Sequence, residues 1–161
     1  MTQEHAHTSL TLERLWQFSL QYYSVREVKE ACLSLQNQFH GNVNLLLLLK
    51  WLDEEQLTFT TEQWPIVSDC LGRSEALLHQ FRELRRKLKG HVTDTLYREA
   101  LQFELHLEKQ QQSDLVECIT TQLTLTSTQQ PELCQRYCRQ LGADKRTAVF
   151  AKPAQPQQKK P

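Results

Sequence analysis

The chain has 161 residues, 39% of them apolar, and its 19 basic side chains are balanced by 19 acidic ones. This length is enough for one domain whose hydrophobic core needs neither a disulfide nor a metal to fold. A net charge of zero excludes a whole-molecule attraction to nucleic acid or to an anionic membrane, so any charged binding surface has to be local.

The two ends of the chain differ in composition from its middle. The first residues, MTQEHAHTSL, contain neither a basic segment nor a continuous apolar segment, which predicts no signal peptide and a cytoplasmic location. The last stretch, KRTAVFAKPAQPQQKKP, is rich in Lys, Gln and Pro, which is typical of disorder. We therefore expect a flexible N-terminus at 1–10, a helical domain at 11–142 and a disordered tail at 143–161.

The first two predicted helices lie at 12–23 and 25–39, where apolar residues recur every three or four positions. The stretch GNVNLLLLLKWL follows at 41–52 and contains five consecutive leucines. It is too short to span a membrane, which takes about 20 apolar residues. Because successive residues advance by about 100°, the leucines surround the helix axis, and other helices must cover them. We expect Gly41 to adopt the left-handed conformation, and Asn42 or Asn44 to cap this helix.

Further helices are predicted at 62–71, 75–89, from 94 onward, at 113–125 and at 131–142, and no segment alternates clearly like a strand. Gly72 either breaks or bends the helical segment between 62 and 89. The run at 109–113 either interrupts the helix that begins at 94 or forms a solvated turn. The leucines from Leu77 to Leu88 and from Leu96 to Leu105 are predicted to face inward. The fold class is therefore an all-α, single-domain bundle of about six to seven helices around a central leucine-rich helix.

Short motifs mark both halves of this domain. They are Leu15-Trp16 with Tyr22, Ala31-Cys32-Leu33 with Leu35-Gln36, Gly41, Val43 to Leu47, Trp51-Leu52, Phe81-Arg82, Leu84-Arg85-Arg86, Leu88-Lys89, and Glu104-Leu105 with Glu108. Together they resemble a family of small bacterial proteins known only as a domain of unknown function. The resemblance spans roughly residues 12–120 and implies a helical fold but no activity. That family tends to carry Asp where this chain has Asn42, and either residue can cap a helix.

Asn44 suggests a ligand site, because a buried amide in the first turn of an apolar helix needs hydrogen-bond partners. A plain helix cap is the alternative. The candidate ligand pocket consists of Asn44, Trp51, Tyr22, Tyr23, Gln36 and His40. The sequence offers no nucleophile with a base, no glycine-rich phosphate loop and no paired acid and base carboxylates, so we predict no catalytic residues.

A second candidate site, for an anion or a partner, is a group of cations near the end of the helix at 75–89. Its members are Arg82, Arg85, Arg86 and Lys89. Arginine suits phosphate or carboxylate, whereas a solvated face at a helix C-terminus explains the same cations. In a third interpretation, Arg85 or Arg86 reaches the next helix across a short turn. The ion-pair partners there would be Glu104 and Glu108.

The cysteines supply the third candidate chemistry. Cys134 and Cys138 lie one turn apart, and together with His5 and His7 they contain the residue types of a zinc site. The histidines are distant in sequence and the spacing is not that of a zinc knuckle. All five cysteines fall in helical patterns, which favours reduced, buried thiols. We predict no metal and no cofactor.

Three functions agree with these features. The sequence favours a noncatalytic cytoplasmic helical interaction protein, or adaptor, with an unknown protein partner. The second is an RNA- or ribosome-associated factor that uses the patch from Arg82 to Lys89 and the basic tail. The third is a small-ligand or enzyme module with a pocket near Asn44. We expect no membrane contact, and a homodimer would follow if Trp64 or the helix at 113–125 left apolar surface exposed.

Overall fold

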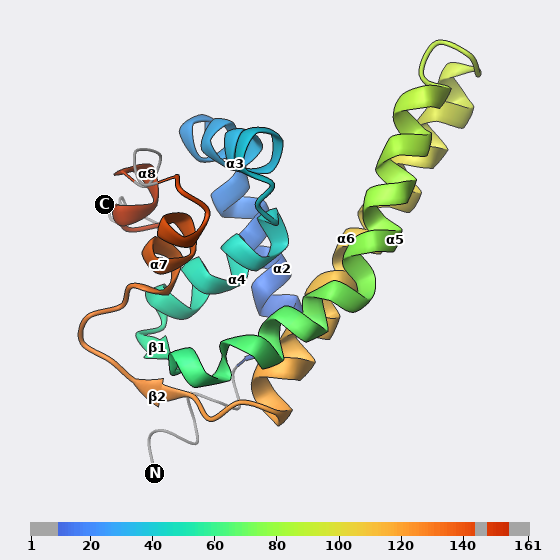
Figure 1. Ribbon diagram of the computed structural model, residues 1–161. Coiled ribbons are helices and arrows are strands. Elements are labelled where there is room, and N and C mark those ends of the chain that lie inside the picture. The colour runs from blue at the N-terminus through green and yellow to red at the C-terminus, as the bar shows by residue number, and fades with distance from the viewer. Residues whose placement is uncertain (1–9, 144–147, 155–161) are drawn as a thin grey trace.

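A group of short helices forms a body from which one long helical hairpin projects (Figure 1). The computed structural model describes residues 10–143 and 148–154. Within these residues the elements are α2 (Leu12–Tyr23), α3 (Arg26–Phe39), α4 (Val43–Glu54), β1 (Leu57–Thr58), the 3-10 helix η1 (Thr61–Gln63), α5 (Trp64–Leu88), α6 (Asp94–Thr121), β2 (Thr126–Ser127), α7 (Leu133–Gln140) and α8 (Ala148–Ala151). None of the described helices is both long and apolar enough to cross a membrane.

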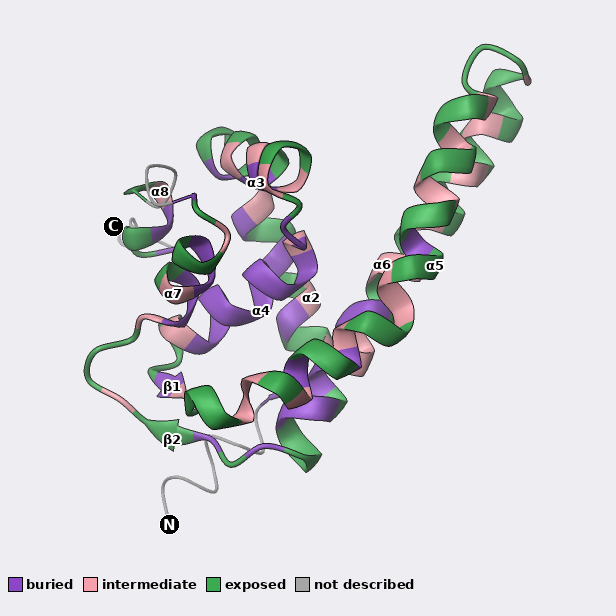
Figure 2. Cartoon of the chain, viewed as in Figure 1, coloured by how far each residue is buried: buried purple, intermediate pink, exposed green. Residues whose placement is uncertain are grey.

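The leucine-rich helix α4 lies at the centre of the body, as predicted, and the all-α fold is confirmed. Its residues from Asn44 to Leu52 are all buried. Helices α2, α3, α6 and α7 pack around it, so each side of the leucine run has an apolar neighbour. Figure 2 shows the buried residues concentrated on α4 and on the elements that surround it.

The turn before α4 differs from the prediction in one respect. His40, not Gly41, adopts the left-handed conformation, with φ of 59°. Gly41 is needed for a different reason, since a Cβ atom there would lie 2.8 Å from Cδ1 of Leu141. Asn42 then caps α4, because its Oδ1 accepts a hydrogen bond from the backbone N of Leu45 at 2.8 Å.

Helices α5 and α6 form the projecting hairpin, and each is longer than the sequence suggests. Gly72 does not break α5, which runs without interruption from Trp64 to Leu88. The run at 109–113 does not interrupt α6, and its Gln111 and Gln112 are buried instead of solvated. The helix predicted at 113–125 is the end of α6 and stops at Thr121.

The far half of the hairpin lies outside the core, and this contradicts part of the predicted inward face. Leu78 is buried, whereas Leu77 and Leu84 on α5 are exposed. On α6, Leu96, Leu101 and Leu105 are exposed as well. The two helices cover each other along only one side, so helical periodicity in this segment does not indicate full burial (Figure 2).

A two-stranded antiparallel sheet was not predicted. In it Leu57 lies opposite Ser127, and Thr58 opposite Thr126. The sheet joins the segment after α4 to the segment after α6. Two-residue strands are too short to show an alternating pattern in the sequence.

Polar side chains of α4 hold the C-terminal helices on the body. Both carboxylate oxygens of Asp53 accept hydrogen bonds at the start of α7, from the backbone N of Leu133 at 3.0 Å and of Cys134 at 3.1 Å. Helix α7 therefore begins at Leu133 and not at Pro131, because a carboxylate from another helix caps it.

The predicted disordered tail at 143–161 is wrong for the described residues 148–154. Helix α8 forms there, and Phe150 is buried. The buried ammonium group of Lys50 donates to the carbonyl oxygens of Phe150 at 2.7 Å and Lys152 at 2.8 Å. The composition of the tail could not reveal these hydrogen bonds, because their donor, Lys50, lies on α4. Residues 144–147 and 155–161 of the tail lie outside the described residues. Residues 1–9 of the predicted flexible N-terminus also lie outside them, and its last residue, Leu10, is buried.

Candidate functional site

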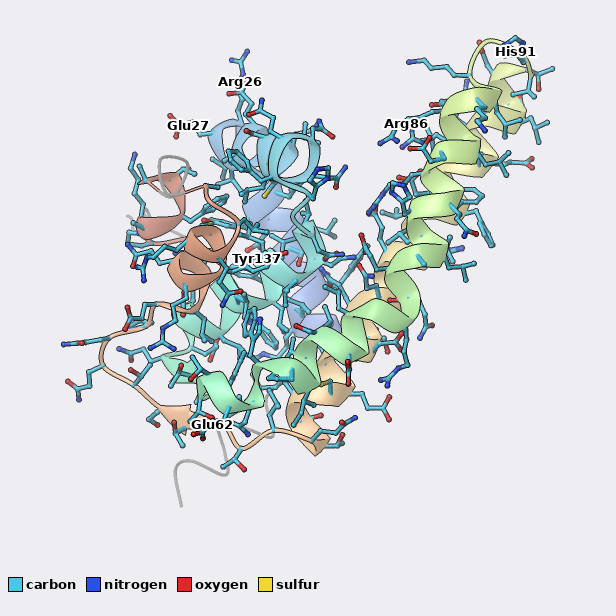
Figure 3. All side chains as sticks on the ribbon, viewed as in Figure 1. Arg26, Glu27, Glu62, Arg86, His91 and Tyr137 are labelled. Atoms are coloured by element: carbon cyan, nitrogen blue, oxygen red, sulfur yellow. The ribbon has the colours of Figure 1, made fainter. Side chains whose placement is uncertain are left out.

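Buried amide side chains connect the start of α4 to α5, α6 and α7. Besides capping α4, the amide nitrogen of Asn42 donates to the carboxylate of Glu75 and, at 3.2 Å, to Oε1 of Gln111. Its backbone N donates to the hydroxyl of Tyr137 at 2.9 Å. Figure 3 labels Tyr137, which comes from α7. The side chain of Asn42 thus joins the start of α4 to α5 and α6, and its backbone joins it to α7.

Position 42 is therefore more than a cap. An Asp at position 42 would keep the acceptor for the backbone of Leu45 but lose both amide donors. Its carboxylate would also face that of Glu75, and like charges at this distance repel. Replacing Asn42 by Asp would therefore be expected to lower the stability of this chain.

Gln111 is the centre of the network. Its Oε1 accepts hydrogen bonds from the side-chain nitrogens of Asn42 at 3.2 Å and Asn44 at 2.9 Å. Its Nε2 donates to Oγ of Ser74 at 2.9 Å and to the carboxylate of Glu75 at 3.2 Å. All four hydrogen-bonding positions of this buried amide are occupied, so Gln111 holds α4, α5 and α6 together.

Gln112 is the neighbouring buried amide, and its hydrogen bonds are incomplete. Its Nε2 donates to Oγ of Ser19 at 2.9 Å and to Oδ1 of Asn44 at 3.2 Å. Its Oε1 accepts no hydrogen bond from the described residues, although the residue is 0% exposed. A buried acceptor without a donor is unfavourable and uncommon. The network of buried amides is therefore complete at Gln111 and incomplete at Gln112.

A cavity of about 180 Å³ lies beside these amides, between the body and the hairpin. Three residues of the predicted pocket, Asn44, Tyr23 and Gln36, line it. The remaining lining residues, which come from α2, α4, α5 and α6, are Trp16, Ser19, Leu20, Val43, Leu47, Arg82, Leu105, Glu108 and Gln112.

The other three predicted pocket residues do not reach this cavity. Trp51 lies two turns after Asn44, about 10 Å further along α4, and lines a different hollow with Phe18. Tyr22 is buried and stacks on Phe18, and burial raises the pKa of its phenol. His40 is exposed at the end of α3. The structure therefore contradicts the predicted grouping for Trp51, Tyr22 and His40.

Two of the four predicted patch residues form ion pairs between α5 and α6. Arg85 donates to both carboxylate oxygens of Glu104, at 2.8 and 3.2 Å, and this hydrogen-bonded pair raises the pKa of Arg85. Arg82 lies 3.3 Å from the carboxylate of Glu108 and 3.7 Å from that of Glu104. Burial raises the pKa of Glu108, and Arg82 opposes this shift. The pairing that the sequence suggested for Arg85 is thus present, and Arg82 joins it.

Arg86 and Lys89, in contrast, do not reach α6. Arg86 pairs with Glu83 on its own helix at 3.0 Å, and both side chains are about half exposed. Lys89 is exposed. Figure 3 shows Arg86 on the far half of the hairpin, and His91 in the turn at its tip. These two cations belong to a solvated surface, whereas Arg82 and Arg85 are part of the hairpin's internal structure.

We predict that Arg85 and Glu104 are energetically coupled. Replacing each by alanine, and then both, should give a coupling free energy of about 1–2 kcal/mol in chemical denaturation, because the pair is bidentate and largely shielded. The exposed pair of Arg86 and Glu83 is the matched control, with an expected coupling of about 0–0.5 kcal/mol. Additive losses at Arg85 and Glu104 would show that the pair does not join the two helices.

The cysteines lie in the interior. All five are buried, and none forms a disulfide. Burial raises the pKa of Cys32 to about 12, and a hydrogen bond with Cys138 together with burial raises that of Cys134. Protonated thiols are poor metal ligands and weak nucleophiles. Of the described residues, no group of three or more His, Cys, Asp or Glu is placed to hold a metal, and His5 and His7 lie outside them.

The cavity is equipped for binding more than for proton transfer. Amides predominate at its buried end, and amides neither give up nor accept protons at neutral pH. Among the described residues, its only charged lining groups are Arg82 and Glu108, which pair with each other. Sequence reasoning found Asn44 but missed Gln111 and Gln112, because a glutamine run of this kind is usually solvated. The sequence did contain an indication of their burial, because Gln111 and Gln112 lie at helical intervals before Leu115 and Ile119 and so share a side of the helix with them.

Comparison with known proteins gives one match. A family model described as "Protein of unknown function (DUF2390)" matches residues 14–115. This is more than half of the chain and includes every residue that lines the cavity. It confirms the resemblance seen in the sequence. No curated protein and no solved structure matches the chain.

Proposed function

We propose, for a chain that belongs to the DUF2390 family of proteins of unknown function, a noncatalytic role in binding another protein through the α5–α6 hairpin. The observation that carries this proposal is the exposed apolar surface of the hairpin. Six of the nine large apolar side chains exposed among the described residues lie on α5 and α6. Exposed apolar groups gathered on one projecting element are typical of an interaction surface.

Four of these exposed side chains and the half-buried Phe81 make up a strip that we call the apolar hairpin face: Leu77, Phe81, Leu84, Leu96 and Phe103. Leu77, Phe81 and Leu84 follow one another at intervals of four and three residues, so they share one side of α5. Leu96 and Phe103 are seven residues apart and share one side of α6. The rings of Phe81 and Phe103 join the two rows, with centroids 5.2 Å apart. The strip fits a partner helix laid along it.

The charges at the far end of the hairpin indicate the chemistry of that partner. Between residues 86 and 96 the chain carries Arg86, Lys87 and Lys89 against Asp94, and because Glu83 pairs with Arg86, the excess positive charge is carried by Lys87 and Lys89. The side chains of the three cations and of Asp94 are exposed. We therefore assign the face to an amphipathic helix with apolar anchors and acidic flanks, since opposite charges favour encounter and fix the register.

Replacing Leu77 and Leu84 together by glutamate tests this proposal. Both leucines are at least half exposed, so the body should keep its fold, whereas acidic groups would repel an acidic helix. The matched control is Leu33→Glu, at an exposed leucine of α3. Tagged protein is crosslinked in its native cells, bound proteins are identified by mass spectrometry, and the affinity for an acidic helix found among them is measured directly.

We expect the control to bind that helix like the unaltered chain, and the double variant to bind it at least about tenfold more weakly. Affinity should also fall with rising salt and on Lys87→Glu. Equal binding by the double variant would refute the assignment. Salt-dependent retention of RNA by the unaltered chain, lost on Lys87→Glu, would favour the RNA-associated alternative, and concentration-dependent dimerisation lost in the double variant would favour a homodimer.

The cytoplasm of a bacterial cell is the proposed location. Five buried cysteines without a disulfide support it, since reduced thiols are typical of that compartment.

A further inference from the structure

Residues 148–154, which we call the docked segment, lie on the outside of the body and bury few of their own side chains. Phe150 and Ala154 are buried, whereas Ala151 and Lys152 are exposed. Helix α8 contacts α3 and α7, and in Figure 1 it lies on the opposite side of the body from the hairpin. A helix of four residues is too short to be stable by itself. The docked segment therefore keeps its conformation because the body holds it.

Two side chains of α4 bind the main chain of this segment. The ammonium group of Lys50 donates to the carbonyl oxygens of Phe150 at 2.7 Å and Lys152 at 2.8 Å. A carboxylate oxygen of Glu54 accepts a hydrogen bond from the backbone N of Ala154 at 3.1 Å. Main-chain hydrogen bonds combined with a pocket for one side chain are a common way of holding a short peptide. The body thus holds residues 148–154 as it would hold a separate peptide with one aromatic anchor.

Release of the docked segment leaves no buried charge without a partner. Lys50 also pairs with Glu54 at 3.1 Å, and the side chain of Glu54 is 31% exposed. The carbonyl groups that cover Lys50 belong to the segment itself, so water replaces them at the ammonium group when the segment leaves. Asp53 holds the start of α7 by separate hydrogen bonds. The body can therefore keep α7 in place while the docked segment is released.

The docked segment fills its surroundings incompletely. An open cavity of about 370 Å³ remains between α4, α7 and α8, and the exposed Ala151 lines it. Among the described residues, the charged groups of the lining are Lys50, Asp53, Glu54 and Glu132. Glu132 also pairs with Arg136 at 3.6 Å, and even without Glu132 two carboxylates remain against one ammonium group. A basic side chain in place of Ala151 would occupy this space and meet a negative charge.

We propose that the surface under the docked segment is a peptide-binding site, which residues 148–154 occupy as an intramolecular ligand until a partner protein replaces them. The partner segment carries an aromatic residue in the place of Phe150, followed directly by an arginine or lysine in the place of Ala151. The docked segment competes at an effective concentration of about millimolar because it is tethered, so the partner needs this additional cation to displace it. The site is separate from the apolar hairpin face, and either assignment can fail without the other.

Synthetic peptides with the sequence of the docked segment, AVFAKPA, and blocked ends test the proposal in fluorescence anisotropy. The full-length Phe150→Ala chain lacks the aromatic anchor, so its own segment should leave the site free. We expect the peptide to bind this variant saturably, and to bind the unaltered chain at least about tenfold more weakly. The Ala151→Arg peptide should bind the variant about threefold more tightly than the original peptide, and the Ala151→Glu peptide should bind more weakly.

Two control substitutions localise the binding. A peptide with Phe150→Ala should not bind, because it lacks the anchor. Lys50→Met, introduced into the Phe150→Ala chain, nearly fills the volume of the lysine but removes the donor to the two carbonyl groups. The original peptide should therefore bind the double variant about tenfold more weakly. Circular dichroism checks that each variant keeps its fold.

Hydrogen exchange of the unaltered chain gives an independent measurement. The backbone N of Ala154 and that of Leu133 each donate to a carboxylate of α4, at 3.1 and 3.0 Å, so the two amides are a matched pair. If the docked segment opens while α7 stays in place, the amide of Ala154 should exchange at least about tenfold faster than that of Leu133, relative to their intrinsic rates.

Several results would overturn the proposal. A Phe150→Ala chain that loses its fold, or amides of Ala154 and Leu133 that exchange at the same rate, would show that the segment is a fixed part of the core. A folded Phe150→Ala chain that binds no peptide, unchanged binding on Lys50→Met, or equal binding of the Ala151→Arg and Ala151→Glu peptides would contradict the assigned contacts. Dimers of the unaltered chain that the peptide dissociates would mean that a second copy, and not a separate partner, uses the site.

Discussion

Replacing Leu48 by alanine is expected to lower the free energy of unfolding by about 3–5 kcal/mol. Leu48 is 0% exposed in the middle of α4. The surrounding helices α2, α3, α6 and α7 would keep the space left by the shortened side chain from closing. The loss therefore includes both the transfer free energy of the three removed carbon atoms and the cost of a cavity that cannot collapse. Equilibrium denaturation in urea, followed by circular dichroism, measures it.

Leu77→Ala is the matched control for this substitution. Leu77 is 62% exposed on α5, so the same change should alter stability by no more than about 0.5 kcal/mol. A loss below about 1 kcal/mol at Leu48 would be inconsistent with a fully enclosed α4. A large loss at Leu77 would mean that the apolar hairpin face is covered in the isolated chain.

Gln111→Leu should have the next largest effect, a loss of about 2–4 kcal/mol in the same denaturation experiment. The leucine nearly fills the volume of the glutamine but removes four hydrogen bonds at once. The amide of Asn44 and the hydroxyl of Ser74 then lose partners in a site that water cannot easily reach, and an unsatisfied buried polar group costs about 1–3 kcal/mol.

Gln110→Leu separates this network effect from any general effect of the substitution. Gln110 is exposed and bonds to Asp114 on the same helix at 3.1 Å. Its replacement should change stability by about 0–0.5 kcal/mol. If the Gln111 and Gln110 variants proved equally stable, the buried amides would rearrange freely, and the network would not determine how α4 meets the hairpin.

The centre of the fold could be predicted because its signal is local. Five consecutive leucines leave a helix no polar side, and the Asn at position 42 provides the cap that starts it, so the position of α4 followed from a dozen residues. The same reasoning placed Asn44 beside a pocket, since a buried amide requires partners. Tyr23 and Gln36 were found because they lie on adjoining helices.

The hairpin could not be predicted to the same degree. A helix that packs against a single neighbour and one that lies in a core can carry the same spacing of apolar residues. The pattern around Leu84 and Leu96 therefore did not show that these two side chains are exposed. Gln111 and Gln112 were misjudged for the converse reason, because their partners come from helices 36 to 93 residues away. Lys50 and Asp53 likewise reveal their roles only when the C-terminal helices are in place.

Those two residues of α4 also constrain the order of folding. Asp53 is bonded to residues 80 and 81 positions later, and Lys50 to residues 100 and 102 positions later. The hairpin, in contrast, joins neighbouring segments and can close early. During synthesis α4 would therefore leave the ribosome well before its last covering helices, with part of its leucine surface in contact with water. High sequence separation of this kind slows folding, so the leucine surface of α4 is covered completely only after α7 has been synthesised.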